Sequence, residues 1–274
     1  MRRFKIIAAS AGMAFVLCTG AAPAMAHEFF ASRLPKPLSE AEPGKIKGIG
    51  IGETMLGREK LNQELVFGAF HIYCAAQTAG QTINEGAVSW ATSPTFVTEV
   101  KFSKCLTQVS AGQFKAGIST NFNVNPETNK SEPLKFVYHV NGFAAFGSGE
   151  TESEVELGSG AASFKIGGKL CKINWPAQTV PTKALVKPEE TFSAVSYSNN
   201  EVPVEAKKIK QFPSLLKNKL IISNDFTTMQ WSYEEGQCLG EGGFEEGATK
   251  TEAKSGIYRG QLEEELVAGN IGFR

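Results

Sequence analysis

The three histidines of the chain, His27, His71 and His139, are the residues with the most direct potential for metal chemistry. Residues 24–26 read Ala-Met-Ala, a pattern typical of signal-peptidase cleavage, which would leave His27 at the mature N-terminus. A terminal histidine can bind copper through its amine and its ring, and His71 or His139 would supply the second imidazole of a histidine brace. A brace needs a firmly held first residue, whereas residues 28–44 are rich in proline and charge. We therefore interpret the position of His27 as the result of cleavage and expect no metal.

Four glutamates in one short segment form a second candidate site. On a strand they would share one face, with neighbours about 7 Å apart, a spacing that could suit calcium or the two carboxylates of a glycan hydrolase. They are Glu150, Glu152, Glu154 and Glu156. No Asp-rich loop supplies further calcium ligands, so we interpret the four as a charged outer face that opposes edge pairing. If residues 158–160, Gly-Ser-Gly, turn a hairpin, Glu154 would lie near Lys165 on the returning strand.

Patterns that identify common enzyme classes do not occur in the sequence. There is no G-x-S-x-G elbow, no H-E-x-x-H helix and no phosphate-binding glycine motif. Two of the three histidines lie in strand-like segments, which leaves few ways to form a Ser-His-Asp triad. We therefore predict no catalytic residue and no cofactor, and a chain that is not an enzyme is the favoured interpretation.

The three tryptophans could stack on sugar rings or fill a core. Trp175 and Trp231 lie close to Cys171 and Cys238 in sequence, which favours core packing beside a disulfide. Trp90 lies in a segment of small and polar residues and is the weak candidate for an exposed ligand-binding side chain.

The ends and the cysteines of the chain indicate export. Residues 1–26 combine a basic start with a short apolar run, as a signal peptide does, and no later run is long enough for a transmembrane span.

Four cysteines remain after cleavage, and an even number in an exported chain indicates two disulfides. Three connectivities are possible; because the shorter loops close more easily, we expect Cys74–Cys105 and Cys171–Cys238. We expect a secreted or extracellular protein, with cell-wall association as a further possibility.

Short segments with alternating polar and apolar residues, separated by Gly-, Ser- and Asn-rich turns, predict an all-β fold: antiparallel sandwich or barrel-like units with few or no helices. Two segments, 58–66 and 260–269, could instead form short helices. A weak similarity between residues 70–78 and 164–179 suggests two related lobes. The predicted divisions are a signal peptide at 1–26, an extended, poorly packed leader at 27–44, a first β lobe at 45–130 and a second at 131–274.

Several short motifs resemble one group of bacterial proteins. They are AHEFFAS at 26–32, FHIYCAAQTAG at 70–80, VKFSKC at 100–105, LCKINWPAQTVP at 170–181, VSYSNN at 195–200, GQC at 236–238, IYRGQL at 257–262 and GNIGF at 269–273. The pattern resembles uncharacterised exported, disulfide-containing, β-rich proteins of actinobacteria, a group with no established activity. The resemblance implies a disulfide-bonded β protein outside the cell and assigns no functional residue.

The net charge does not indicate a class of binding partner, since 28 basic residues balance 28 acidic ones and the formal net charge is zero. We expect no nucleic-acid binding, and a cell-surface polymer or an extracellular protein as the partner. The favoured function is a non-catalytic binding or structural protein of the envelope or the extracellular space. The alternative is a secreted enzyme, either a glycan hydrolase or a histidine-brace copper oxidase.

Overall fold

The structure of the chain is a computed structural model. It describes residues 28–33, 45–52, 61–81, 90–109, 117–125, 127–141, 151–184, 193–203, 216–233, 238, 254–266 and 269–273. In these residues 82% of positions are strand and 0% are helix, which confirms the all-β prediction. The described parts of the two segments with helical potential, 61–66 and 260–266, contain strand and no helix, and Leu65, Leu262 and Leu266 are buried in the core.

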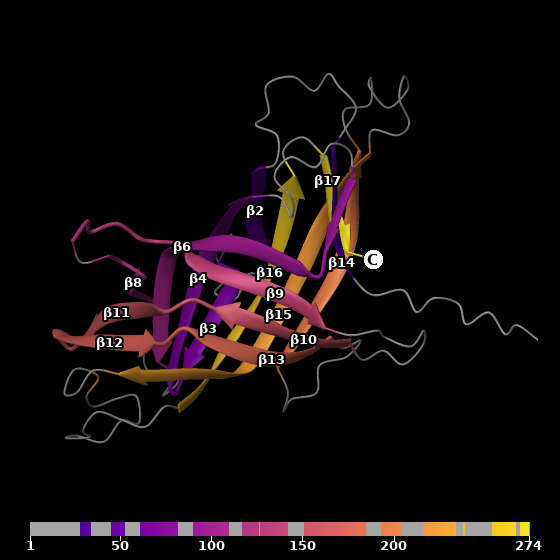
Figure 1. Cartoon of the computed structure of the whole chain (residues 1–274). Helices are drawn as coiled ribbons and strands as arrows, with labels where there is room; N and C mark the ends of the chain where they lie inside the picture. The colour runs from indigo at the N-terminus through magenta and orange to yellow at the C-terminus, as the bar shows by residue number, and fades with distance from the viewer. Residues whose placement is uncertain are drawn as a thin grey trace, which may run out of the picture.

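The described residues form seventeen strands, arranged as Figure 1 shows. They are β1 (Phe29–Arg33), β2 (Lys45–Ile51), β3 (Gln63–Phe67), β4 (Phe70–Gln81), β5 (Trp90–Ser93), β6 (Thr95–Val109), β7 (Ile118–Ser119), β8 (Asn121–Phe122), β9 (Leu134–Asn141), β10 (Thr151–Leu157), β11 (Gly160–Ile166), β12 (Lys169–Trp175), β13 (Gln178–Ala184), β14 (Ala194–Pro203), β15 (Leu216–Tyr233), β16 (Lys254–Leu266) and β17 (Gly269–Phe273).

Fourteen of these strands form one sheet in the order β2-β16-β3-β4-β6-β9-β10-β13-β14-β15-β12-β11-β8, with β7 paired to β6. The long strand β16 also pairs with β15, so the pairing returns on itself through β3, β4, β6, β9, β10, β13 and β14. Strands β2 and β3 occupy the same gap, because each pairs with both β16 and β4. All pairings in this sheet are antiparallel except the single parallel pair between β13 and β14.

A second sheet of three strands, in the order β17-β1-β5, connects the start of the described chain to its end. Phe29 of β1 is fully buried, with ring centroids 5.0 Å from Tyr197 and 5.3 Å from Phe273. Asn199 of β14 exchanges two hydrogen bonds with the Phe273 backbone, at 2.8 and 2.9 Å, and so joins the two sheets. The prediction of a poorly packed leader is therefore wrong for Phe29 and Ala31, whose side chains are buried in the core.

One hydrophobic core runs through strands from both predicted lobes. Phe70 of β4 lies 5.0 Å from Phe164 of β11, and Phe102 of β6 lies 6.2 Å from Tyr258 of β16, between ring centroids. Since one core and one sheet contain strands from both halves, two lobes are not confirmed. The two similar sequence segments also differ in structure, because residues 70–78 lie within one strand while residues 164–179 extend from β11 into β13.

Two disulfides join the expected partners, Cys74–Cys105 and Cys171–Cys238. The first bridges β4 and β6, and the second joins β12 to a residue near the end of β15. Within the described residues, we find no helix with the length and apolar character needed to cross a membrane. The disulfides are compatible with an extracellular protein. The predicted signal peptide and His27 lie outside the described residues.

Candidate functional site

A groove of about 410 Å³ lies on the outer face of the sheet where β9, β10 and β13 run side by side. Its walls combine charged, polar and small apolar residues, which are Lys135, Val137, Glu156, Leu157, Gly158, Ala177, Gln178 and Thr179. The register aligns Val137, Glu156 and Thr179 in one row across three strands. Carboxylate, hydroxyl and aliphatic groups are thereby adjacent at the surface.

Small residues next to this row create the depression. The Gly158 backbone N–H donates to the Lys135 carbonyl at 2.9 Å, and Ala177 lies in the short connection between β12 and β13. Neither residue has a side chain that reaches beyond its own backbone, so the surface is hollow between the longer side chains of Lys135 and Thr179. The Lys135 side chain stands exposed at the rim of the groove.

The carboxylate of Glu156 is oriented by a neighbouring histidine. His139 Nε2 lies 2.9 Å from Glu156 Oε1, and His139 Nδ1 lies 3.3 Å from the Thr95 hydroxyl. In the neutral ring this arrangement assigns the proton to Nε2, which donates to Glu156, while Nδ1 accepts from Thr95. Glu156 therefore presents an oriented, half-exposed carboxylate to the groove.

The opposite wall is held by backbone contacts. Gln178 Nε2 donates to the carbonyls of Pro176 and Gln230, at 3.2 and 3.0 Å, and Gln178 Oε1 accepts from the Gln230 N–H at 2.6 Å. Because its amide is fully used in these bonds, Gln178 shapes the groove rather than binding a ligand. The groups left for a ligand are the Lys135 amine, the Glu156 carboxylate and the Thr179 hydroxyl.

Only part of the predicted glutamate row is described. Glu150 lies outside the described residues, and Glu152 contributes a strand position whose side chain is not described. Glu154 pairs with His139 and Pro181, because β10 pairs with β9 and β13. The predicted hairpin that would bring Glu154 near Lys165 is therefore wrong, since Lys165 faces Leu170 on β12. Among the described residues, no group of three His, Cys, Asp or Glu could hold a metal ion, so the calcium hypothesis has no support there.

The two described histidines cannot share a copper ion. His71 pairs with Gln108 near one end of β6, and His139 pairs with Thr95 at the other end, so roughly 40 Å of strand, measured along β6, lies between their pairing positions. His27, which the brace also requires, lies outside the described residues. A brace could therefore use only one of the two strand histidines.

His71 belongs to a separate polar cluster on the outer face of β3 and β4. Its Nδ1 lies 2.9 Å from Glu64 Oε1, and its ring stacks on Tyr73 with centroids 6.3 Å apart. Burial raises the pKa of Tyr73 to about 12, and the charge and the hydrogen bond of Glu64 add to the rise.

The tryptophan prediction is confirmed for two of three residues. Trp175 and Trp231 are both almost fully buried, and both contact Phe67, at centroid distances of 5.6 and 5.5 Å. Trp90 lies in β5, but its side chain is not among those described. Its predicted role as a ligand-binding residue stays a prediction.

Sequence reasoning missed a buried carboxyl group in the core. Glu264 of β16 is fully buried, and its oxygens accept hydrogen bonds from Thr78 at 2.6 Å and Thr98 at 3.0 Å. Burial raises the pKa of Glu264 to about 7, against the two hydrogen bonds, which lower it. The sequence shows three consecutive glutamates at this point, a pattern that resembles a solvated segment and does not identify the buried member.

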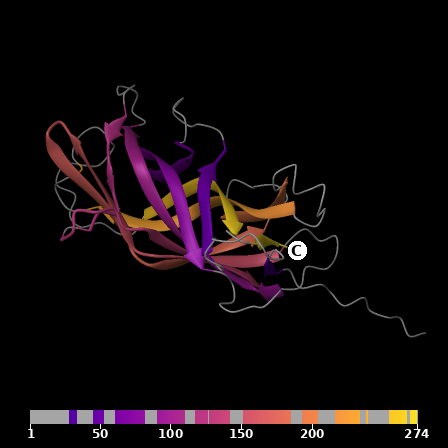
Figure 2. The same ribbon diagram turned by 90° about the horizontal axis from the view of Figure 1, so that it is seen from above.

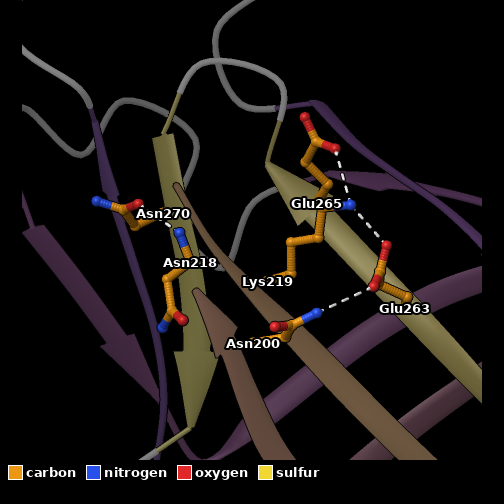
Figure 3. A network of polar contacts seen from close by, with 6 residues as sticks. All are labelled: Asn200, Asn218, Lys219, Glu263, Glu265 and Asn270. Atoms are coloured by element: carbon orange, nitrogen blue, oxygen red, sulfur yellow. Dashed lines mark hydrogen bonds and ion pairs between the residues drawn. The ribbon is translucent and has the colours of Figure 1, made fainter. Parts of the chain in front are cut away.

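Glu263 and Glu265, which flank Glu264 in the sequence, both contact Lys219 (Figure 3). On the outer face, the Lys219 amine lies 2.6 Å from Glu263 and 3.6 Å from Glu265. The hydrogen bond to Glu263 is the main cause that raises the pKa of Lys219. Because side chains alternate along the strand, Glu264 faces the core, while Glu263 and Glu265 face outward and form an ion-pair network with Lys219.

Comparison with protein-family models, with curated proteins and with solved structures gave no match.

Proposed function

We propose that the protein is an extracellular binding protein whose groove on β9, β10 and β13 holds a segment of a hydroxyl-rich polymer of the cell surface. The observation that carries this proposal is the row of Val137, Glu156 and Thr179 beside the Lys135 amine. Sugar hydroxyls bind well to carboxylate, amine and hydroxyl groups, and the aliphatic side chain suits the apolar edge of a ring.

Rigidity also supports a binding role. The groove lies on paired strands rather than on a loop, and both His139 and Gln178 are held by hydrogen bonds on each side of it. A site that is already ordered before binding loses little conformational entropy when the ligand arrives. The two disulfides limit unfolding of the same sheet in an oxidising environment.

An array of immobilised glycans, probed with the purified disulfide-bonded chain, tests the proposal. We expect saturable binding to at least one glycan, and a loss of at least tenfold in affinity for Ala177→Phe, which fills the groove. Glu156→Gln should also weaken binding, because it removes the charged acceptor. Gln77→Phe places the same ring at an exposed position of β4 outside the groove and should leave affinity unchanged. Absence of glycan binding, or equal binding by wild type and Ala177→Phe, contradicts the proposal.

A glycan hydrolase is the second candidate, because Glu154 and Glu156 share the outward face beside the groove, about 7 Å apart as alternate strand residues. Inverting hydrolases hold their two carboxyl groups at a comparable separation. Release of reducing ends from a bound glycan, abolished by either Glu154→Gln or Glu156→Gln, would favour this candidate over simple binding. Binding without release leaves the non-catalytic proposal in place.

A further inference from the structure

The β11–β12 hairpin projects from the body of the sheet, as both views show (Figures 1 and 2). Its tip is the pair Gly167 and Gly168, with φ of 55° and 82°. These left-handed conformations are those of a tight two-residue hairpin turn, and they favour glycine. A Cβ at either position would meet nothing within 4 Å, so the tip is open to solvent.

The hairpin is anchored close to its tip, within three residues of the turn. Phe164 is buried against Phe70 of β4 with centroids 5.0 Å apart, and Ile166 packs on the edge of the same core. Directly opposite Phe164, Cys171 forms the disulfide with Cys238. The tip is therefore a rigid projection whose orientation is set before it meets a partner.

The outer part of the hairpin is basic and partly apolar. Residues 160–175 contain Lys165, Lys169 and Lys172 and no acidic residue. Leu170 is 43% exposed and lies opposite Lys165 across the two strands. Within the described part of the chain, neither Lys165 nor Lys169 forms an ion pair.

A fourth lysine, the exposed Lys104, lies on β6. Lys104 is exposed at an irregularity of β6, with a φ of 53°. The backbone carbonyl of the next residue, Cys105, accepts a hydrogen bond from the Thr120 N–H at 3.0 Å, and Asn121 pairs with Ser163 of the hairpin. These backbone pairings connect the strand of Lys104 to the hairpin through β8.

We propose that the hairpin tip docks on an anionic lipid surface. Lys165 shares a face of the hairpin with Leu170, and Lys169 lies on the other face beside the turn. Both amines therefore contact lipid phosphates when the tip approaches end-on, and Leu170 enters the boundary between headgroups and acyl chains. The exposed leucine favours a bilayer over a soluble polyanion, because only the bilayer offers an apolar region next to its phosphates. This surface is distinct from the groove, so the two proposals fail independently.

Co-sedimentation with vesicles tests the docking. The purified disulfide-bonded chain is mixed with vesicles of phosphatidylglycerol and phosphatidylcholine in equal parts, or of phosphatidylcholine alone. We expect binding only to the anionic vesicles, weakened by added salt. Each lysine near the surface contributes roughly fivefold in affinity, so Lys165→Gln with Lys169→Gln should lose about twenty-five-fold. Leu170→Ser keeps the charge and should lose severalfold.

The matched control removes two exposed lysines elsewhere, Lys47→Gln with Lys101→Gln, and should retain full binding. Thermal unfolding checks that each variant keeps its fold. Equal binding to both vesicle types, or equal losses in the control and the hairpin variant, overturns the proposal. Binding to soluble polyphosphate that competes with vesicles and is unaffected by Leu170→Ser overturns it in favour of a polyanion partner.

Discussion

Thr78 and Glu264, separated by 186 positions in the sequence, are joined by a hydrogen bond of 2.6 Å inside the core. Thr98 of β6 donates a second hydrogen bond to the other oxygen of the same carboxyl group, at 3.0 Å. Three strands, β4, β6 and β16, thus meet at one buried acidic side chain. Its protonation is coupled to folding, because the unfolded chain exposes the group to water.

Stability is expected to fall as the pH rises from about 4.5 to about 7 because of Glu264. Between these values the folded protein keeps the proton on Glu264 while the unfolded chain has lost it, so a rise in pH favours unfolding. The stabilisation by protonated Glu264 is fully present below pH 4.5, and roughly 3 kcal/mol of the free energy of unfolding is lost between pH 4.5 and pH 7. The free energy of unfolding of wild type and of Glu264→Gln, measured with denaturant at several pH values, isolates the pH dependence that is due to Glu264. A difference between the two proteins that does not change with pH would contradict the assignment.

Gly48→Ala should destabilise the fold strongly, since a methyl group there would lie 2.7 Å from Glu264 Oε2 and overlap the Glu263 carbonyl oxygen and the Thr78 hydroxyl. Overpacking of this kind costs about 1–3 kcal/mol or more. Gly158→Ala is the matched control, because its methyl group would meet the Lys135 backbone nitrogen at an ordinary 3.5 Å. Chemical denaturation of both variants should show a large loss for the first and little change for the second.

Loss of the Cys171–Cys238 disulfide should cost more than loss of Cys74–Cys105. The first closes a separation of 67 residues and the second one of 31, and the chain-entropy model gives roughly 4 kcal/mol for the longer loop and slightly less for the shorter. Both cysteines of one disulfide are replaced by alanine in each of two variants, and the losses in the free energy of unfolding are compared. The reverse order would show that native packing, rather than unfolded-chain entropy, governs the difference.

Glu64→Gln should lower the pKa of Tyr73 from about 12 toward its ordinary value of 10.0. The substitution removes the charge that opposes ionisation of the phenol, while the burial that contributes most remains, so the fall should be partial. Ring-carbon NMR of tyrosine follows the titration in the folded protein, with Tyr73→Phe to assign the signal. An unchanged pKa would mean that Glu64 does not act on Tyr73.

The all-β fold could be predicted because its signal is local. Segments such as Leu134–Asn141 alternate between core and surface residues, and this alternation is visible without knowledge of any partner strand. The helical potential of the segment around Glu263 was misleading, since its leucines and glutamates suit a helix and a two-sided strand equally. The segment forms strand β16 because it pairs with β15 on one side and with β2 and β3 on the other.

The candidate site was only partly predictable. Glu154 and Glu156 were expected on a common outer face, but Lys135, Gln178 and Thr179 had no distinguishing pattern. Their proximity depends on β9, β10 and β13 being neighbours, and β10 was expected to pair with β11 instead. The flexible turn residues at 158–160 allow either pairing, so local sequence could not select between them.

By itself, the sequence determined the strand character of the chain and the two disulfide pairs that shorter loops favour, because these depend on side-chain alternation and on distance along the chain. Only the tertiary structure decided which strands became neighbours, and with them the groove, the projecting hairpin and the burial of Glu264. These features bring together residues up to 186 positions apart. Contacts at such range depend on how the whole core packs, which no local pattern encodes.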